Sequence, residues 1–424
     1  MTQSLGNVFD ELSWRGLIAL STDEQDLRAA LSAGPVTYYC GFDPTAPSLH
    51  MGNLVQLLTM RRLQDFGHKP LALVGGATGL IGDPRMSGER VLNDPATVAD
   101  WLERIRSQVE RFLSFEGENA ARVVNNLDWS APMSAIDFLR DVGKHFRLSR
   151  MLSKEAVSAR LNSEVGISFT EFSYQLLQGM DFYELYRRYG CTLQTGGSDQ
   201  WGNLTAGADL THRVEGVSLH ALATPLITKA DGTKFGKTEG GAIWLDPEMT
   251  SPYAFYQFWL NAEDAKVTDY LKIFTFRERE EIDALDAVTR ERPAERVAQR
   301  ALAEDVTSLV HGKEAMVRVR EASQALFGRG DLAALDASTL REAVQELPSA
   351  AVLRGEHDIA ELLATTGLVA SRSAGRRTIA EGGAYVNNTK VSSEDATVDV
   401  ADLLHGRWIL LRRGRRSLAV VEAV

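Results

Sequence analysis

The chain has 424 residues, of which 44% are hydrophobic and 24% charged, and at roughly 100–200 residues per domain this length suits two to four folded domains. No apolar run reaches the roughly 18 residues of a membrane helix, and the first residues do not resemble a secretory signal, so we expect a cytoplasmic protein without a membrane segment. The two cysteines lack zinc-type spacing, so we expect reduced thiols and no metal site of its own. The net charge of −11 disfavours nucleic acid as a partner of the chain as a whole.

The first half of the chain predicts alternating helices and strands. Two short amphipathic helices precede a β-rich segment at 36–42 and a helix at 49–66, for which Ser48 is the expected N-cap. A buried strand at 71–79 completes a βαβ unit, which implies parallel strands and a right-handed crossover. The alternation continues with a helix at 98–115, a strand at 122–129, a helix at 169–190 and a strand at 191–197. Residues 1–228 are therefore expected to form a Rossmann-like, doubly wound α/β domain with N-terminal helices.

The second half has a different character. Residues 229–345 are helical and charged in pattern, and residues 346–424 predict a linker at 346–358 followed by a small α+β unit. From residue 370 onward nine Lys or Arg stand against six Asp or Glu, a net charge of +3. Such asymmetry predicts a nucleic-acid-binding module at this end of the chain.

The segment from Tyr39 to Asn53 combines a strand end, a loop and a helix N-terminus. Ligands bind at this edge of open parallel sheets, and free backbone N–H groups favour an anion there. Thr45 and His50 can donate to phosphate oxygens, and Gly52 leaves room for a nucleotide against the helix. The alternative is an ordinary βα turn with a helix-capping histidine.

A second segment, ADGTKFGKTEGG, carries Lys234 and Lys237 in glycine-rich surroundings. Two lysines three residues apart suit a mobile loop that closes on phosphates and stabilises the charge of a departing pyrophosphate. The alternative is a solvated basic turn.

Two further sets of polar residues lie in the α/β half of the chain. Tyr174, Gln178 and Asp181 have the spacing of one helix face, which forms either a substrate wall or a solvated surface. The segment at 197–203 lies at a strand end, where Ser198 is the expected N-cap of the next helix.

The H-x-G-N and K-F-G-K-T segments together resemble the two signatures of class I aminoacyl-tRNA synthetases. The surrounding sequence resembles the tyrosyl enzymes of bacteria more closely. The resemblance lies in the segments GFDPTAPSLHMGN, LVGGATGLIGDP, TEFSYQLLQGMDF, LQTGGSDQWGN and ADGTKFGKT. The resemblance covers essentially the whole chain. It implies activation of L-tyrosine by ATP to tyrosyl-adenylate and pyrophosphate, with Mg²⁺ on the ATP phosphates, and then transfer of tyrosine to the 3′ end of its tRNA.

The resemblance also implies roles for particular residues. The substrate tyrosine is assigned to Tyr39 and Asp181 at the phenol, to Tyr174, Gln178 and Asp83 at the ammonium group, and to Gln200 near the carboxylate, with Gln194 also in the site. ATP is assigned to Gly41, Asp43, His50, Gly52, Asn53, Gly197, Asp199, Lys234 and Lys237. Stabilisation of the transition state and of the departing pyrophosphate is assigned to Thr45, His50, Lys234, Lys237 and Arg90.

The resemblance extends to the other two parts of the chain. It implies an anticodon-side role for the helical part and an S4-type RNA-binding module in 346–424, with tRNA contacts at Arg372, Arg376 and Arg377 and a homodimer bridged by tRNA. The chain departs from many relatives at Asn53, where they have histidine, and near Arg85, where longer relatives carry a lysine.

Three rival functions remain open at this stage. A tryptophanyl enzyme shares the fold, but Tyr39 and Asp181 at the phenol end argue against it. A relative that binds RNA without chemistry is opposed by the intact His50 and the two lysines of the basic loop. A small nucleotidylyltransferase would lack the C-terminal half.

Overall fold

The computed structural model describes residues 7–84, 92–152, 155–164, 166–238, 241–328, 330–345, 347–414 and 417–424. The chain divides into two compact units. The first consists of Met1–Met249 with Glu263–Ala287, and the second of Thr250–Ala262 with Val288–Val424. The domain boundaries predicted after residues 228 and 345 remain predictions. Among the described residues, no helix is both long and apolar enough to cross a bilayer.

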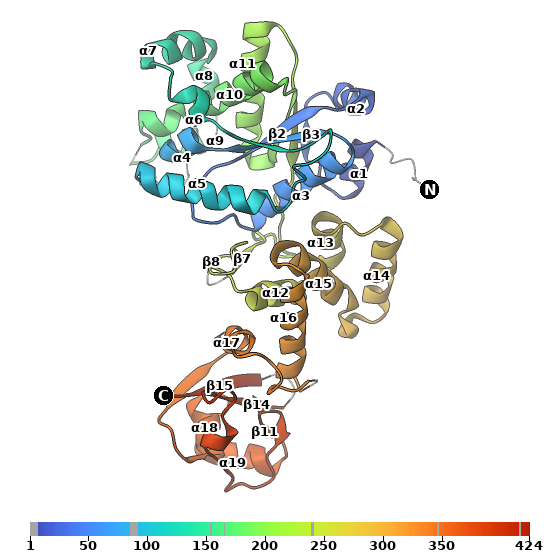
Figure 1. The fold of residues 1–424 in the computed structure, drawn as a ribbon, viewed down its shortest axis with the longest axis vertical. Coiled ribbons are helices and arrows are strands. Elements are labelled where there is room, and N and C mark those ends of the chain that lie inside the picture. The colour runs from blue at the N-terminus through green and yellow to red at the C-terminus, as the bar shows by residue number, and fades with distance from the viewer. Residues whose placement is uncertain are drawn as a thin grey trace. The chain divides into compact units, whose positions relative to one another are not determined.

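A six-stranded sheet forms the centre of the first unit (Figure 1), in the order β1-β6-β5-β2-β3-β4. Its strands are β1 Leu20–Ser21, β2 Thr37–Phe42, β3 Lys69–Val74, β4 Arg122–Asn125, β5 Leu193–Gly197 and β6 His220–Thr224. All neighbours are parallel except β1, which pairs antiparallel with β6. From β2 the chain adds β3 and β4 on one side and β5 and β6 on the other. The predicted doubly wound fold is therefore confirmed, with its switch point between β2 and β5.

Helices supply the remaining core of this unit. The longer ones are α1 Val8–Trp14, α2 Glu24–Ala33, α3 Met51–Asp65, α5 Pro95–Val109, α10 Phe169–Tyr189, α11 Trp201–Glu215, α13 Val267–Phe274 and α14 Arg279–Glu291, whose last residues, from Val288, belong to the second unit. The shorter ones are α4 Gly76–Ile81, α6 Leu127–Ser130, α7 Ala135–Asp137, α8 Leu148–Leu152 and α9 Glu155–Leu161. Local sequence explains their ends: Ser168 caps the start of α10, and Gly190 ends it in the left-handed conformation.

Four local expectations were wrong, among them the strand at 122–129, which ends at Asn125 before α6 begins at Leu127. His50, not Ser48, caps α3, because the Ser48 hydroxyl is engaged with the Leu49 carbonyl and the Asp246 amide. Ser198 caps no helix: it lies in a 3₁₀ turn, and α11 begins only at Trp201. The strand expected at 71–79 ends at Val74, and α4 follows at once.

The glycine after β3 explains that early end. A Cβ added at Gly75 would lie 2.0 Å from the Asp43 carboxylate, so this sharp turn beside Asp43 requires a residue without a side chain.

The second unit begins with helices and ends with a five-stranded sheet, in the order β12-β11-β14-β15-β9. Its helices are α12 Pro252–Leu260, α15 Val297–His311, α16 Lys313–Leu326, α17 Ala337–Gln345, α18 Ile359–Thr365 and α19 Arg372–Ala380. Its strands are β9 Ser349–Val352, β11 Ala384–Val386, β12 Thr389–Lys390, β14 Trp408–Arg413 and β15 Ser417–Ala423, with the separate pair β10 His357–Asp358 and β13 Thr397–Val398. The helices α18 and α19 pack with this sheet around one apolar core.

The predicted linker at 346–358 was wrong over part of its length. Within it, β9 pairs in parallel with β15, from Ser349 opposite Val420 to Val352 opposite Ala423. The strand signal of this short segment is weak, since it shows only alternating exposure. It forms a strand because its backbone can hydrogen-bond to the edge of β15.

Candidate active site

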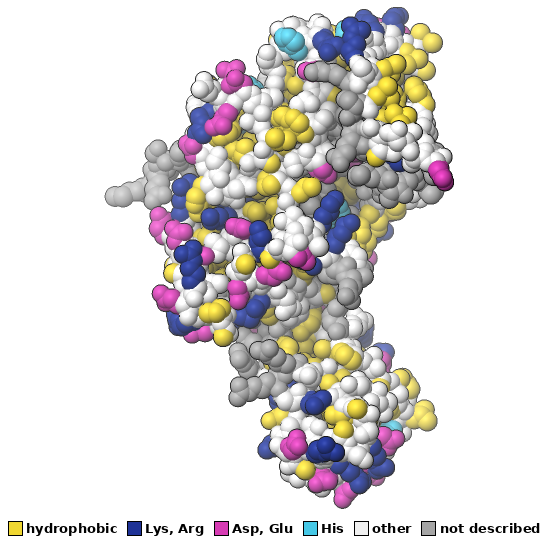
Figure 2. All heavy atoms as spheres, turned by 180° about the vertical axis from the view of Figure 1, so that it is seen from behind, with side chains coloured by type: hydrophobic (Ala, Val, Ile, Leu, Met, Phe, Trp, Pro, Cys, Tyr) yellow, Lys and Arg dark blue, Asp and Glu magenta, His cyan; other side chains and the backbone are white. Residues whose placement is uncertain are grey.

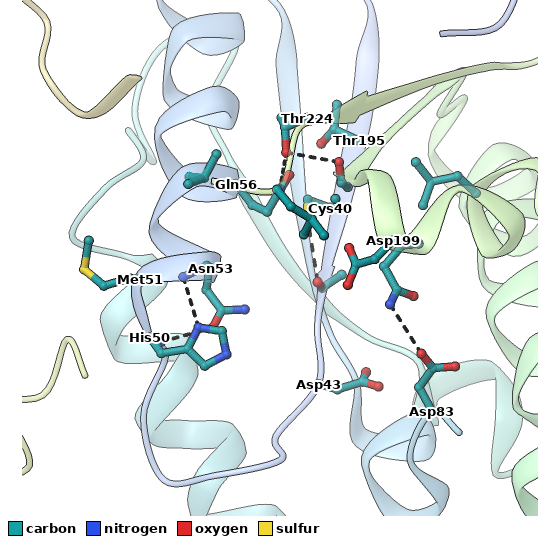
Figure 3. A pocket seen from close by; sticks show the side chains of 18 of the residues that line it. Cys40, Asp43, His50, Met51, Asn53, Gln56, Asp83, Thr195, Asp199 and Thr224 are labelled. Atoms are coloured by element: carbon teal, nitrogen blue, oxygen red, sulfur yellow. Dashed lines mark hydrogen bonds between the residues drawn. The ribbon is translucent and has the colours of Figure 1, made fainter. Parts of the chain in front are cut away.

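A cavity of about 480 Å³ opens in the first unit where β2, β5 and β6 end. Every tyrosine- or ATP-binding residue suggested by the sequence lines it, and so do Thr45 and Gln194. The exception among the catalytic candidates is Arg90, which lies outside the described residues, as does Arg85. Figure 3 shows His50 and Asn53 at the start of α3, facing Asp43, Asp83 and Asp199 across the cavity.

His50 occupies the N-cap of α3. Its Nδ1 accepts the amide N–H of Gly52 at 3.1 Å, and Asn53 completes a capping box on the His50 amide. Because Nδ1 is an acceptor, the neutral ring carries its proton on Nε2, which is left to donate. His50 keeps an exposed edge, but partial desolvation and the nearby Lys237 lower its pKa. The capping alternative and a donor role toward phosphate are therefore compatible.

The residues just after the lysine segment are hydrogen-bonded to the chain at the start of α3. The Met51 amide donates to the Ile243 carbonyl at 3.1 Å, and the Leu245 amide donates to the Leu49 carbonyl at 2.9 Å. Gly236, at φ +82°, lies so close that an added Cβ would be 2.6 Å from the Met51 Cβ. This glycine lets the loop approach α3, so that Lys234 and Lys237 line the same cavity as His50.

A buried carboxylate stands at the α10 end of the cavity. Asp181 accepts the indole N–H of Trp129 at 2.8 Å and the side-chain amide of Asn126 at 3.1 Å. Burial raises the pKa of Asp181 to about 7 in spite of these two donors. The Tyr39 hydroxyl is also buried here and has no hydrogen-bond partner within the described part of the chain. This end therefore presents an unsatisfied phenol and a carboxylate to a ligand.

Asp43 connects the α10 side of the cavity with α4. The Tyr174 hydroxyl donates to one of its carboxylate oxygens at 2.6 Å, and the Thr78 hydroxyl donates to the other at 2.6 Å. Asn126, which also bonds Asp181, donates to the Thr78 hydroxyl at 3.0 Å. One hydrogen-bonded chain therefore runs from Asp181 to Asp43.

The remaining wall is built from the ends of β5 and α4. The Gln200 amide donates to Asp83 at 3.3 Å, and the Asn203 amide donates to Gln200 at 2.7 Å. The side-chain carbonyls of Gln178 and Gln194 are buried without a partner among the described residues. Since a buried acceptor without a donor is costly, these oxygens suit a polar ligand.

Sequence reasoning missed several residues of this site. Asn126 and Trp129 follow β4, and their place after a strand at the carboxyl edge is the signal that could have found them. Cys40 was considered only for its redox state, yet it lines the cavity. Thr78 belongs to α4, in a stretch that was interpreted as strand.

The three arginines suggested for tRNA lie on α19 and are exposed. Arg372 is bonded to Asp358, and Arg376 to Asp395 at 3.2 Å. Contact with tRNA therefore remains a prediction.

Comparison with known proteins identifies the family. The family described as tRNA synthetases class I (W and Y) matches residues 31–328, and the tyrosine–tRNA ligase SYY-like C-terminal domain matches residues 339–421. The chain is 65% identical to a tyrosine–tRNA ligase of Streptomyces coelicolor over 98% of this chain and 99% of that protein, and 60% identical to one of Acidothermus cellulolyticus with the same coverage. Among solved structures, a C-terminally truncated mitochondrial tyrosyl-tRNA synthetase of Aspergillus nidulans has a TM-score of 0.69 at 29% identity, covering 76% of this chain and 94% of that one. The chain therefore belongs to the tyrosyl-tRNA synthetases, within the class I tRNA synthetases.

Proposed function

We infer that this cavity is the active site of a tyrosine–tRNA ligase, which forms tyrosyl-adenylate from L-tyrosine and ATP and then esterifies the tRNA. The main observation in support of this function is that the histidine motif and the lysine motif line the same cavity. His50, Lys234 and Lys237 line one cavity at the switch point of the sheet, and the same cavity ends in Tyr39 and Asp181.

The α10 end suits the side chain of the substrate. The substrate phenol would donate to Asp181 and accept from Tyr39, whose hydroxyl has no partner among the described residues. Asp83, Tyr174 and Gln178 would surround its ammonium group. Phenylalanine would leave these buried groups without a partner, and tyrosyl-tRNA synthetases are themselves the standard example of such rejection, by roughly 10⁵.

The α3 end suits the nucleotide. The α-phosphorus of ATP would lie near the N-terminus of α3, where Thr45 and the free Nε2 of His50 can donate. Asp43, Asp199 and Asn53 would hold the ribose side, and the backbone of Gly41, Gly52 and Gly197 would leave room for it. Gln200 would lie near the tyrosine carboxylate.

The first chemical step needs little proton transfer. The tyrosine carboxylate is already an anion and attacks the α-phosphorus, so the bond to pyrophosphate breaks without a general base. Catalysis then consists of stabilising the pentacoordinate phosphorus and the departing charge, by Thr45, His50, Lys234 and Lys237, together with Arg90. In the second step, a ribose hydroxyl at the tRNA 3′ end takes the acyl group, and AMP leaves.

Magnesium would enter with ATP. Mg²⁺ favours phosphate oxygens and water and seldom uses a protein cage in such sites. The described residues contain no group of three or more His, Cys, Asp or Glu that could hold a metal ion. We propose that the ion is held through the phosphate oxygens and water.

A second copy of the chain is the partner that we propose for the region between α7 and the start of α10. Its described residues include strongly exposed apolar side chains: Ile136 at 71%, Leu139 at 52%, Leu148 at 64% and Phe169 at 73%. Figure 2 shows hydrophobic side chains gathered at the upper right, over this region. The resemblance to tyrosyl-tRNA synthetases implies a homodimer, and burying these side chains in one would remove them from water.

For tRNA we propose the C-terminal module, with Arg372, Arg376 and Arg377 facing the phosphate backbone. We also place the enzyme in the cytoplasm, where the buried free thiols of Cys40 and Cys191 stay reduced.

The decisive test is exchange of labelled pyrophosphate into ATP. We expect exchange with tyrosine, none with tryptophan, and loss of exchange in Asp181→Ala. Exchange supported by tryptophan, or no exchange with any amino acid, would refute the proposed function.

A further inference from the structure

The lysine segment starts inside a short hairpin, residues 227–235, that is closed by its own backbone. The Phe235 amide donates to the Ile227 carbonyl at 3.0 Å. Next to this hydrogen bond, Thr228 and Lys234 form an antiparallel bridge. Because Lys234 belongs to this closed unit, whatever fixes the hairpin also fixes the lysine.

The aromatic side chains of α13 support this hairpin. The centroid of the Phe235 ring lies 4.2 Å from that of Tyr270 and 5.8 Å from that of Phe274. Tyr270 and Phe274 are four residues apart on one face of α13, and both are buried. Such ring pairs add to the stabilisation that burial provides. The residue that follows Lys234 in the chain is therefore seated on α13.

Two hydrogen bonds strengthen the same contact. The Tyr270 hydroxyl donates to the Thr228 carbonyl at 3.0 Å. The Ala230 amide donates to the carboxylate of Glu263, shortly before α13, at 2.7 Å. Tyr270 thus contacts the hairpin twice, through its ring and through its hydroxyl, and the two contacts can be removed one at a time.

The helix that supports the hairpin is itself tied to the rest of the first unit. At the end of α13, the Thr275 carbonyl accepts hydrogen bonds from Arg15 at 3.0 Å and from Arg62 at 2.6 Å. Both guanidinium groups are buried, and cations at a helix C-terminus stabilise its dipole. Arg62 belongs to α3, the helix that His50 caps, so α13 holds the hairpin in a fixed relation to His50.

Tyr270 lies outside the cavity wall, whereas Lys234, Phe235 and Lys237 are part of it. We propose that Tyr270 is a positioning residue for the activation step: it anchors the hairpin to α13 and so keeps Lys234 and Lys237 at the cavity. Without this anchor, kcat would fall with the fraction of molecules in which the lysines are in place. This inference rests on the proposed function, since the lysines act there only if pyrophosphate leaves from this cavity.

The test measures tyrosine-dependent pyrophosphate exchange in Tyr270→Phe, which removes only the hydroxyl, and in Tyr270→Leu, which also removes the ring. We expect kcat to fall about threefold to tenfold in the first variant and about 10–100-fold in the second, with the KM for tyrosine unchanged. Tyr256→Leu, at a buried tyrosine of α12 in the second unit, is the matched control. It should lower the melting temperature and leave kcat within about twofold of wild type.

Limited digestion with trypsin measures the anchoring in the absence of any substrate. Trypsin cleaves after lysine and requires a locally opened chain, so its rate follows the population of the open form. Cleavage after Lys229 and Lys234, located by mass spectrometry, should be about tenfold faster in Tyr270→Leu than in wild type. In Tyr256→Leu, cleavage at these two sites should match the wild type.

Three results would overturn the inference with the wild type still active. The first is an unchanged kcat in both Tyr270 variants, and the second is unchanged cleavage of the hairpin in Tyr270→Leu. The third is an equal loss of kcat in Tyr256→Leu, which would mean that Tyr270 contributes only to general stability. Absence of tyrosine-dependent exchange in the wild type would instead refute the proposed function, and the role of Tyr270 in activation with it, while the digestion would still show whether Tyr270 anchors the hairpin.

Discussion

The indole N–H of Trp129 donates to the carboxylate of Asp181 at 2.8 Å, so a residue from the segment after β4 orients an acid on α10. Both side chains are buried, at 3% and 1% exposure, and the hydrogen bond favours the ionised carboxylate against the effect of burial. Trp129 is thus a positioning residue for the proposed phenol site.

Replacing Trp129 with Phe should therefore weaken tyrosine binding through Asp181. The carboxyl group would keep only Asn126 as donor, and its pKa would rise further. At pH 7 we expect tyrosine affinity to fall about tenfold, with partial recovery at pH 9, where the acid ionises in both proteins. Titration calorimetry at the two pH values measures this, with Trp101→Phe on α5 as the control. An equal loss at both pH values would mean that Trp129 only fills space.

Asp181 should also leave a signature in the pH dependence of stability. Its pKa rises from 3.8 in the unfolded chain to about 7 in the folded one, so the folded state binds the proton more tightly. The contribution of Asp181 to the free energy of unfolding therefore falls as the pH rises between these values, by a few kcal/mol at most. Urea denaturation of wild type and Asp181→Asn between pH 4 and 8 should show the variant gaining stability over wild type as the pH rises. Parallel curves would contradict the raised pKa.

Lys237→Ala should slow the activation step and leave tyrosine binding intact. Loss of one cation that stabilises the departing pyrophosphate should lower kcat for pyrophosphate exchange about 10²–10³-fold, or about 3–4 kcal/mol. Lys229→Ala, immediately before the lysine segment and not on the cavity wall, is the control. An effect confined to the KM for tyrosine would disprove the role given to Lys237.

Gly236→Ala should hold the lysine loop away from α3. The substitution adds the strain of φ +82° to a contact of 2.6 Å with the Met51 Cβ. Gly232→Ala is a matched control, because Gly232 has the same φ of +82° but nothing within 4 Å of an added Cβ. We expect kcat for exchange to fall at least about tenfold more in Gly236→Ala than in Gly232→Ala, since the backbone strain is common to both and overpacking against Met51 costs about 1–3 kcal/mol more. Equal effects would show that backbone conformation alone matters.

Charges placed in the exposed apolar region between α7 and α10 should prevent self-association. We expect Leu148→Glu combined with Phe169→Glu to sediment as a monomer at concentrations where the wild type is a dimer. Leu353→Glu, at a position with 77% exposure in the second unit, should leave the dimer intact. A wild-type monomer, or a dimer that survives the double substitution, would refute the proposed interface.

Much of the first unit was predictable because its signals are local. The strand β2 followed from its β-rich composition and the polar face of α10 from helical spacing, whereas the roles of most residues that line the cavity came from the resemblance to tyrosyl-tRNA synthetases. The proton acceptor that caps α3 was misassigned, because a histidine and a serine two residues apart are both plausible caps. Only the contacts of Ser48 with Leu49 and Asp246 decide between them.

Other features depended on partners distant in the chain. The strand β9 has little strand propensity of its own and exists because β15 offers it an edge. The chain of hydrogen bonds from Asp181 to Asp43 joins residues of four different segments, and no spacing rule connects Asn126 with Thr78. Burial, likewise, sets the pKa of Asp181 and cannot be read from one sequence.

The pairing of Leu49 and Met51 with Ile243 and Leu245 uses main-chain atoms alone. The four side chains are buried, so exchanges among apolar residues of similar size would keep these hydrogen bonds, whereas polar or charged replacements would disturb the core. Proline at position 51 or 245 would remove an N–H that donates one of these hydrogen bonds, and so would weaken the contact between the lysine loop and the start of α3.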